Sequence, residues 1–282
     1  YRWSFEMTGM PDYMKFGMWR DGYYMATNTY YGNDIYVFER DEMLIGAEFP
    51  QMVQFNNQWR PYSGFHCIQP LDNDGMYAPE NSPGLFITIN DDAWNGNDEL
   101  WVYECDVDWN DPGSSTFNRT QQISVAPFDT NFGAWSNNIS QPGTSQKIDA
   151  IPMILMYRAQ YRNFGTHQTI VCCHTVDVDG TNHAGIRWYE LMKTNTDWEI
   201  RQEGTYAPDE HSRFMGSIAM NSRKEIAIGY SISSTTEFPG LRYSGQSSEE
   251  NDLASGIMDI SEEIILSGTM SQQNYDRWGD YS

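Results

Sequence analysis

The sequence has few basic residues and no long hydrophobic run. Seventeen lysines and arginines stand against thirty-nine aspartates and glutamates, which gives a formal net charge of −22. Such a charge repels nucleic-acid phosphate and anionic lipid, so we expect neither to be a partner. The longest strongly apolar run, residues 150–157, is interrupted by Pro152 and is much shorter than the ~20 residues that a membrane-spanning helix needs. We therefore predict no insertion into a membrane.

Several motifs that identify enzymes and metal sites are also absent. The histidines show no HExxH spacing, and the chain holds neither GxSxG nor CxxC nor a glycine-rich phosphate loop. These absences argue against zinc catalysis, a serine hydrolase, a redox motif and nucleotide binding. Four cysteines allow three pairings if all are oxidised, and buried free thiols are the alternative.

The sequence does contain recurring pairs of strand-like runs. Aromatic residues make up 15% of the chain, and no long segment has helical periodicity with caps. Each pair consists of a strand-like run, a polar turn and a second strand-like run. The pairs are 23–28 with 34–39, 85–90 with 99–104, and 170–176 with 184–191. A fourth unit has three runs, at 215–221, 225–233 and 241–244. This pattern predicts an all-β fold, a β-propeller of about five or more blades, with a β-sandwich as the alternative.

We treat residues 1–282 as a single propeller domain. The chain begins with Tyr1, and residues 277–282 look like a strand cut off in mid-element, so we expect a fragment of a longer protein. Polar stretches rich in Gly, Ser, Asn or Asp are predicted loops, at 70–83, 108–120, 131–146 and 244–255.

Several strings of the sequence are similar to those of a family of large secreted bacterial proteins. They are DYMKFGMWRDGYYMATN (12–28), QPGTSQKIDAIPMILMYRAQYRNFG (141–165), AGIRWYEL (184–191), QEGTYAPDEHSRFMGSIAM (202–220), IAIGYSISS (226–234) and RWGDYS (277–282). The chain resembles the propeller-like region of these proteins, which are labelled uncharacterised or sialidase-like and often carry a C-terminal sorting domain. The resemblance implies a β-propeller that is secreted or held at the cell surface. The SxDxGxxW box of sialidase blades is absent.

Arginines are the first candidates for a ligand site. Strand alternation in residues 157–162 places Arg158, Gln160 and Arg162 on one face. Together with Arg187, these arginines would grip a ligand carboxylate bidentately, as an arginine cluster does in sialic-acid recognition. The alternative is that each arginine pairs with one of the many acidic side chains.

Tryptophans and paired aspartates are further candidates. Trp94, Trp109, Trp135 and Trp198 lie in turn-rich surroundings, where their rings would stack on sugars or pack between blades. The turn at Asp72 and Asp74, with Glu80 nearby, offers oxygen ligands for Ca²⁺, although ordinary hairpins use the same residues.

These observations together predict an extracellular or cell-surface module that binds or supports other molecules without catalysis of its own. Its expected partners are a glycan, a protein, or other domains of the same parent chain. One alternative is a sialidase-like glycosidase, in which Arg158, Arg162 and Arg187 meet at one mouth of the propeller and Asp280 or Glu190 assists. Another is a subunit of an extracellular assembly.

Overall fold

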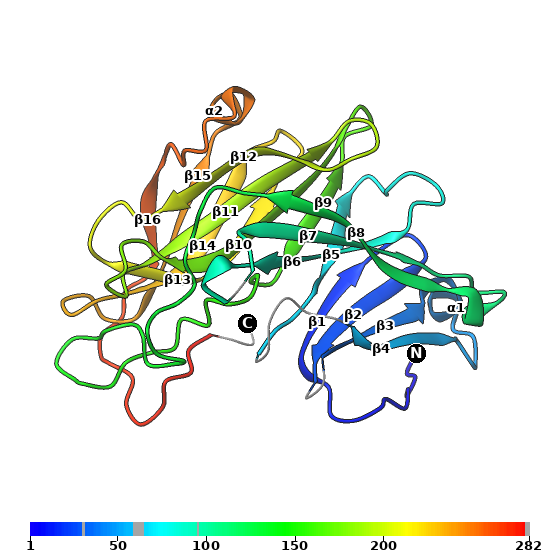
Figure 1. The fold of residues 1–282 in the computed structure, drawn as a ribbon, viewed down its shortest axis with the longest axis horizontal. Helices are drawn as coiled ribbons and strands as arrows, with labels where there is room; N and C mark the ends of the chain where they lie inside the picture. Colours follow the sequence, from blue (N-terminus) through cyan, green and yellow to red (C-terminus); the bar gives the residue numbers. More distant parts are fainter. Residues whose placement is uncertain (30–31, 59–64, 95, 280–282) are drawn as a thin grey trace.

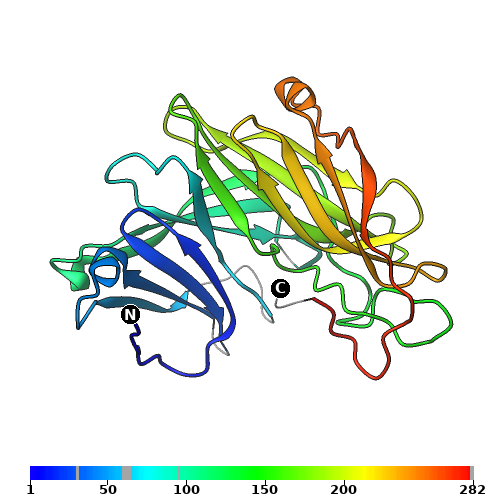
Figure 2. The same ribbon diagram turned by 180° about the vertical axis from the view of Figure 1, so that it is seen from behind.

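The computed structural model describes residues 1–29, 32–58, 65–94 and 96–279, and these form an almost entirely β structure (Figures 1 and 2). The first sheet contains β1 (Asp12–Met18), β2 (Gly22–Asn28), β3 (Asn33–Glu39) and β4 (Met52–Gln58). The next strands are β5 (Gln69–Gly75), β6 (Gly84–Asn90), β7 (Glu99–Asp106), β8 (Thr116–Ser124), β9 (Ala159–Asn163), β10 (Gln168–Asp177), β11 (Ala184–Lys193) and β12 (Glu199–Tyr206). The last sheet contains β13 (Ser212–Met220), β14 (Ile226–Ser233), β15 (Gly240–Gln246) and β16 (Ile260–Leu266).

The strands form four consecutive antiparallel meanders of four strands each. The first strands of the second and third meanders, β5 and β9, pair in parallel and join these meanders into one eight-stranded sheet. Strand β1 packs against β5, and β13 packs against β9 and β10. The meanders therefore spread outward from their first strands, as the blades of a propeller do. In Figures 1 and 2 the first sheet (blue) and the last (yellow to orange) lie at opposite ends of the eight-stranded sheet.

The prediction of an all-β propeller is confirmed, and so are the predicted pairs of strands. Within the described residues there are four meanders, whereas the sequence indicated about five or more blades. Three predicted loops were partly wrong, because 70–83 includes most of β5, 108–120 includes the start of β8, and 244–255 includes a short helix. Polar side chains misled the prediction there, since β5 carries ion-paired aspartates and β8 is an edge strand facing solvent.

Apolar side chains from all four meanders meet in one large core. The rings of Tyr24 and Phe86 lie 5.7 Å apart and join the first sheet to the second. Trp19 contacts Tyr161 of the third meander, with ring centroids 4.7 Å apart. All four cysteines are buried free thiols, which agrees with the alternative that the sequence left open.

The two α-helices among the described residues are short and peripheral. Helix α1 (Arg40–Ile45) joins β3 to β4, and α2 (Ser248–Leu253) joins β15 to β16. No helix in the described part of the chain is long and apolar enough to span a bilayer.

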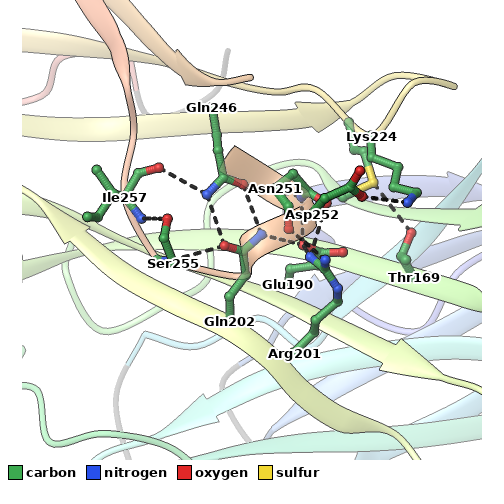
Figure 3. A network of polar contacts seen from close by, with 12 residues as sticks. Thr169, Glu190, Arg201, Gln202, Lys224, Gln246, Asn251, Asp252, Ser255 and Ile257 are labelled. Atoms are coloured by element: carbon green, nitrogen blue, oxygen red, sulfur yellow. Dashed lines mark hydrogen bonds and ion pairs between the residues drawn. The ribbon is translucent and has the colours of Figure 1, made fainter. Parts of the chain in front are cut away.

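A buried polar network attaches α2 and the last sheet to the third meander (Figure 3). At its centre is Glu190 of β11, whose side chain is almost completely buried. Its carboxylate accepts hydrogen bonds from Arg201 Nη1 at 2.9 Å, Gln202 Nε2 at 2.6 Å and Asn251 Nδ2 at 2.9 Å. Gln246 of β15 exchanges hydrogen bonds with Gln202. Because each buried group has a partner, the network fixes the position of α2.

Candidate functional site

A cluster of charged side chains lies where β5 and β9 run side by side. The parallel register pairs Asp72 with Gln160 and Asp74 with Arg162. Arg158 binds Asp72 and also donates to Asp74 Oδ2 at 3.0 Å. Gln160 Nε2 donates to the same oxygen, Asp74 Oδ2, at 2.6 Å. Arg162 Nη2 lies 3.8 Å from that oxygen. Arg158, Gln160 and Arg162 therefore share a face, as strand alternation predicted.

This cluster connects the first sheet to the last. The backbone N–H of Met18 in β1 donates to Asp72 Oδ1 at 2.9 Å. Met220, the last residue of β13, donates its backbone N–H to Gln160 Oε1 at 2.6 Å and accepts from Arg162 Nε at 3.1 Å. The charged side chains thus contact backbone groups of both neighbouring sheets and hold them beside the inner strands.

Beside the cluster lies a hollow, which we call the trough, with a volume of about 510 Å³. Its floor includes Ala219, Ala227 and Gly245, which pair with one another across β13, β14 and β15, and the same row continues to Ile260 of β16. A side chain at Gly245 would place its Cβ 2.6 Å from the carbonyl oxygen of Ile226, so this position requires glycine. The small residues leave a flat nonpolar surface across the last sheet.

One aromatic ring and several polar groups border the trough. Tyr243 of β15 lines it and is 42% exposed. Asp74, Gln160 and Arg162 contribute polar groups from the inner strands, and Asn221 and Glu225 contribute them from the turn between β13 and β14. The sequence reasoning missed Tyr243. A signal was present, because small residues alternate with large ones in 226–230, which indicates a strand with one uncovered face.

Both carboxylates of the trough have a lowered pKa. Burial by itself raises the pKa of Asp74, but hydrogen bonds from Gln160 and Arg158 outweigh burial, so the net shift is downward. Hydrogen bonds from Asn221 and Arg223 lower the pKa of Glu225. At neutral pH both groups are therefore ionised and act as hydrogen-bond acceptors.

We expect Asp74→Asn to lower the free energy of unfolding at neutral pH by about 1 kcal/mol. Hydrogen bonds to a charged group contribute about 1.5–3 kcal/mol, and partial exposure of Asp74 reduces that value. Because the pKa of Asp74 is lowered on folding, its contribution is present above the unfolded pKa of about 3.9 and is lost as the pH falls through the folded pKa. Urea denaturation at pH 7 and pH 3 measures this.

The control for this variant is Asp41→Asn, because the Asp41 side chain is 79% exposed. The stability difference between the native protein and Asp74→Asn is expected to shrink at pH 3, whereas Asp41→Asn changes little at either pH. An Asp74→Asn difference that is the same at both pH values would contradict the assignment.

The structure separates Arg187 from the other two predicted arginines. Arg162 pairs with Thr169 and Arg187 pairs with His174, on opposite edges of β10. Directly paired residues point to the same face, and Thr169 and His174 are an odd number of residues apart in a regular strand. Arg162 and Arg187 therefore lie on opposite faces of the sheet. The prediction that three arginines meet at one mouth was wrong, and Arg187 binds Glu203 instead.

Two carboxylates, Glu190 and Asp280, were proposed to assist that arginine cluster, and the structure describes one of them. Glu190 belongs to the buried network around α2 and is engaged with Arg201. Asp280 lies outside the described residues.

Three of the four predicted tryptophans take part in packing. Trp94 packs partly buried against the core and donates to Thr130 Oγ1 at 2.9 Å. Trp109 packs in a similar way, and Trp198 is buried. Trp135 differs, because it is 58% exposed and lines a smaller hollow of about 200 Å³. Of these four rings, Trp135 is therefore the most accessible to a ligand.

The aspartates proposed for calcium lie in a strand, so their assignment to a long loop was wrong. Asp72 and Asp74 belong to β5 and are both bound by Arg158, which a cation at these oxygens would have to displace. Glu80 is exposed in the loop that follows β5. In the described part of the chain, a different group, Asp91, Asp92 and Asp98, brings three carboxylates within 4.8 Å of one another. Calcium binding at Asp72, Asp74 and Glu80 stays a prediction.

Comparison with known proteins identifies no family. No protein-family model matches the chain, and no curated protein matches it. Among solved structures, the alpha-L-arabinanase of Penicillium chrysogenum complexed with arabinobiose is similar, at 13% sequence identity and a TM-score of 0.49. The match covers 90% of this chain and 66% of the arabinanase chain, so this chain spans less than two thirds of that protein's length.

Proposed function

We propose that the protein is an extracellular or cell-surface module that binds a neutral glycan in the trough and does not hydrolyse it. The observation that carries this proposal is the flat row of Ala219, Ala227 and Gly245 beside the exposed ring of Tyr243, with polar side chains at its border. A sugar ring has an apolar C–H face and polar edges. The nonpolar row of the trough suits the C–H face of the sugar, and the polar side chains at its border suit the polar edges.

The ionisation of the trough favours binding over hydrolysis. Glycoside hydrolysis by two carboxyl groups needs one of them to be held protonated as a general acid, which requires a raised pKa. The pKa of Asp74 and that of Glu225 are both lowered. Both carboxylates are suited to accept hydrogen bonds from sugar hydroxyls.

The charge of the protein favours a neutral glycan over an acidic one. The chain has a formal net charge of −22, and two ionised carboxylates line the trough. Arg162 is the trough residue suited to an anion, but it already contacts Met220 and Asp74. The negative charge of the protein would therefore repel an acidic sugar. Arg162 would not compensate for this repulsion, because its guanidinium already has other contacts.

We expect Tyr243→Ala to weaken binding of a neutral oligosaccharide about tenfold, which corresponds to ~1.4 kcal/mol. A glycan array selects the oligosaccharide, and isothermal titration calorimetry then measures its affinity for each variant. Tyr275→Ala is the matched control, because Tyr275 is 75% exposed and is not among the trough residues.

Three results would contradict the proposal. They are an array without any bound neutral glycan, an affinity that Tyr243→Ala leaves unchanged, or release of new reducing ends from the bound oligosaccharide. The last result would favour the glycosidase alternative. A preference for sialylated or uronic-acid glycans would overturn the part of the proposal that concerns charge.

A further inference from the structure

The outermost strand of the last sheet differs from the other three outermost strands. Strands β4, β8 and β12 each end a meander, and among their described residues none exposes a large hydrophobic side chain. Strand β16 exposes four, because Ile260 is 43%, Ile264 61%, Ile265 58% and Leu266 61% exposed. Edge strands of soluble proteins are normally protected by charge or by covering segments, so β16 is unusual.

The backbone of β16 is suited to pair with another strand. It pairs with β15 along one side and has no neighbouring strand in the described residues along the other. Its apolar side chains also continue into the sheet, since Leu266 pairs with Leu241, which is 36% exposed. An added strand would gain ladder hydrogen bonds and contacts with exposed aliphatic groups.

The charge around β16 determines the kind of partner. Residues 243–276 contain seven acidic side chains and no lysine, arginine or histidine. Glu262 is paired with Arg213 and Asp252 with Lys224, which leaves five acidic side chains outside these two ion pairs. Glu263 within the strand and Asp259 just before it are exposed. A second copy of the chain would bring the same acidic strand and a further net charge of −22 to the interface, which disfavours pairing of two copies. A basic strand is complementary.

We propose that β16 is a docking edge for an extended segment of another protein in which aliphatic residues alternate with lysine or arginine. The segment adds to the sheet as a fifth strand beside β16. Its aliphatic side chains pack against Leu266 and Leu241, which pair with each other and are both exposed, and its basic side chains approach the exposed carboxylates of Asp259 and Glu263. This interaction goes beyond the proposed glycan binding, and its test does not depend on that proposal.

The test uses a fluorescein-labelled peptide of alternating lysine and valine, capped at both ends, and measures binding by fluorescence anisotropy. One control peptide has glutamate in place of lysine, and another has proline at its centre, which removes a ladder donor. The protein variant combines Ile264→Lys with Ile265→Lys. Its matched control combines Asn118→Lys with Ser124→Lys, which adds the same charge at exposed positions of the β8 edge.

The native protein and the β8 control are expected to bind the lysine–valine peptide with similar affinity, and the β16 variant at least about tenfold more weakly. Both control peptides are expected to bind more weakly to the native protein. The proposal is overturned if the native protein does not bind the lysine–valine peptide, or if the two protein variants bind it equally well. It is also overturned if sedimentation shows a native dimer that the β16 variant abolishes, because the occupant would then be a second copy.

Discussion

Arg213→Met is expected to lower the free energy of unfolding by about 3 kcal/mol. The Arg213 side chain is fully buried, and its guanidinium donates to Asp209 at 2.8 and 3.0 Å and to Glu262 at 2.7 and 3.2 Å. Removing one partner of a buried ion pair costs about 3–5 kcal/mol, because the other charge is left without compensation. Asp209 and Glu262 keep partial access to water, which places the expected loss at the lower end of that range.

The control for Arg213 is Arg223→Met. Arg223 also pairs with a carboxylate, that of Glu225, but its side chain is 75% exposed, so we expect a loss of at most about 1 kcal/mol. Urea denaturation followed by tryptophan fluorescence measures both variants. Equal losses would show that burial of the Arg213 ion pairs does not determine stability.

The Arg213 variant is also expected to change the acid limb of the stability curve. Hydrogen bonds from Arg213 lower the pKa of Asp209 in the folded protein. The stability that this carboxylate contributes is therefore present above its unfolded pKa and is lost as the pH falls through its folded pKa. Without Arg213, the free energy of unfolding no longer contains this pH-dependent contribution from Asp209. The stability deficit of Arg213→Met is accordingly expected to become smaller below about pH 4.

Glu190→Ala is expected to destabilise the protein by about 3 kcal/mol. The variant removes the acceptor for Arg201, Gln202 and Asn251 at the centre of the buried network. Those donors remain buried or partly buried without it, and an unpaired buried polar group costs about 1–3 kcal/mol. Helix α2 is then no longer fixed, since Asn251 is its buried residue.

Two measurements separate a local effect of Glu190→Ala from a global one. Urea denaturation gives the global loss, and hydrogen exchange of the amides in 247–259 reports the opening of the segment that contains α2. Glu199→Ala on the neighbouring strand is the control, because Glu199 is exposed, and we expect a change within about 0.5 kcal/mol. Unchanged exchange in this segment would contradict the proposed role of the network.

Both variants affect the sheet that carries the trough and the β16 edge. Arg213 connects β13 to Glu262 of β16, and Glu190 connects the third meander to α2. Neither residue is among those that line the trough. If glycan binding depends on a rigid last sheet, these variants weaken it in proportion to their destabilisation, whereas Tyr243→Ala weakens it without loss of stability.

The sequence alone determined the strand pairs and one polar face, because these are local properties. Alternation of side chains over a few residues places Arg158, Gln160 and Arg162 together, and turn residues between β-branched and aromatic runs delimit most of the inner and middle strands. Such signals need no knowledge of distant parts of the chain. They failed for β5 and β8, where polar side chains looked like loops.

Only the tertiary structure decided which residues meet. Parallel pairing of β5 with β9 brings Asp74 to Arg158 and Gln160, and packing of β13 against β9 adds Asn221 and Tyr243 beside them. The same pairing pattern puts Arg187 on the opposite face of the sheet from Arg162. A sequence does not contain the register between distant strands, and a shift of one residue would send each side chain to the other face. The trough and the exposed edge of β16 exist for that reason only in the folded chain.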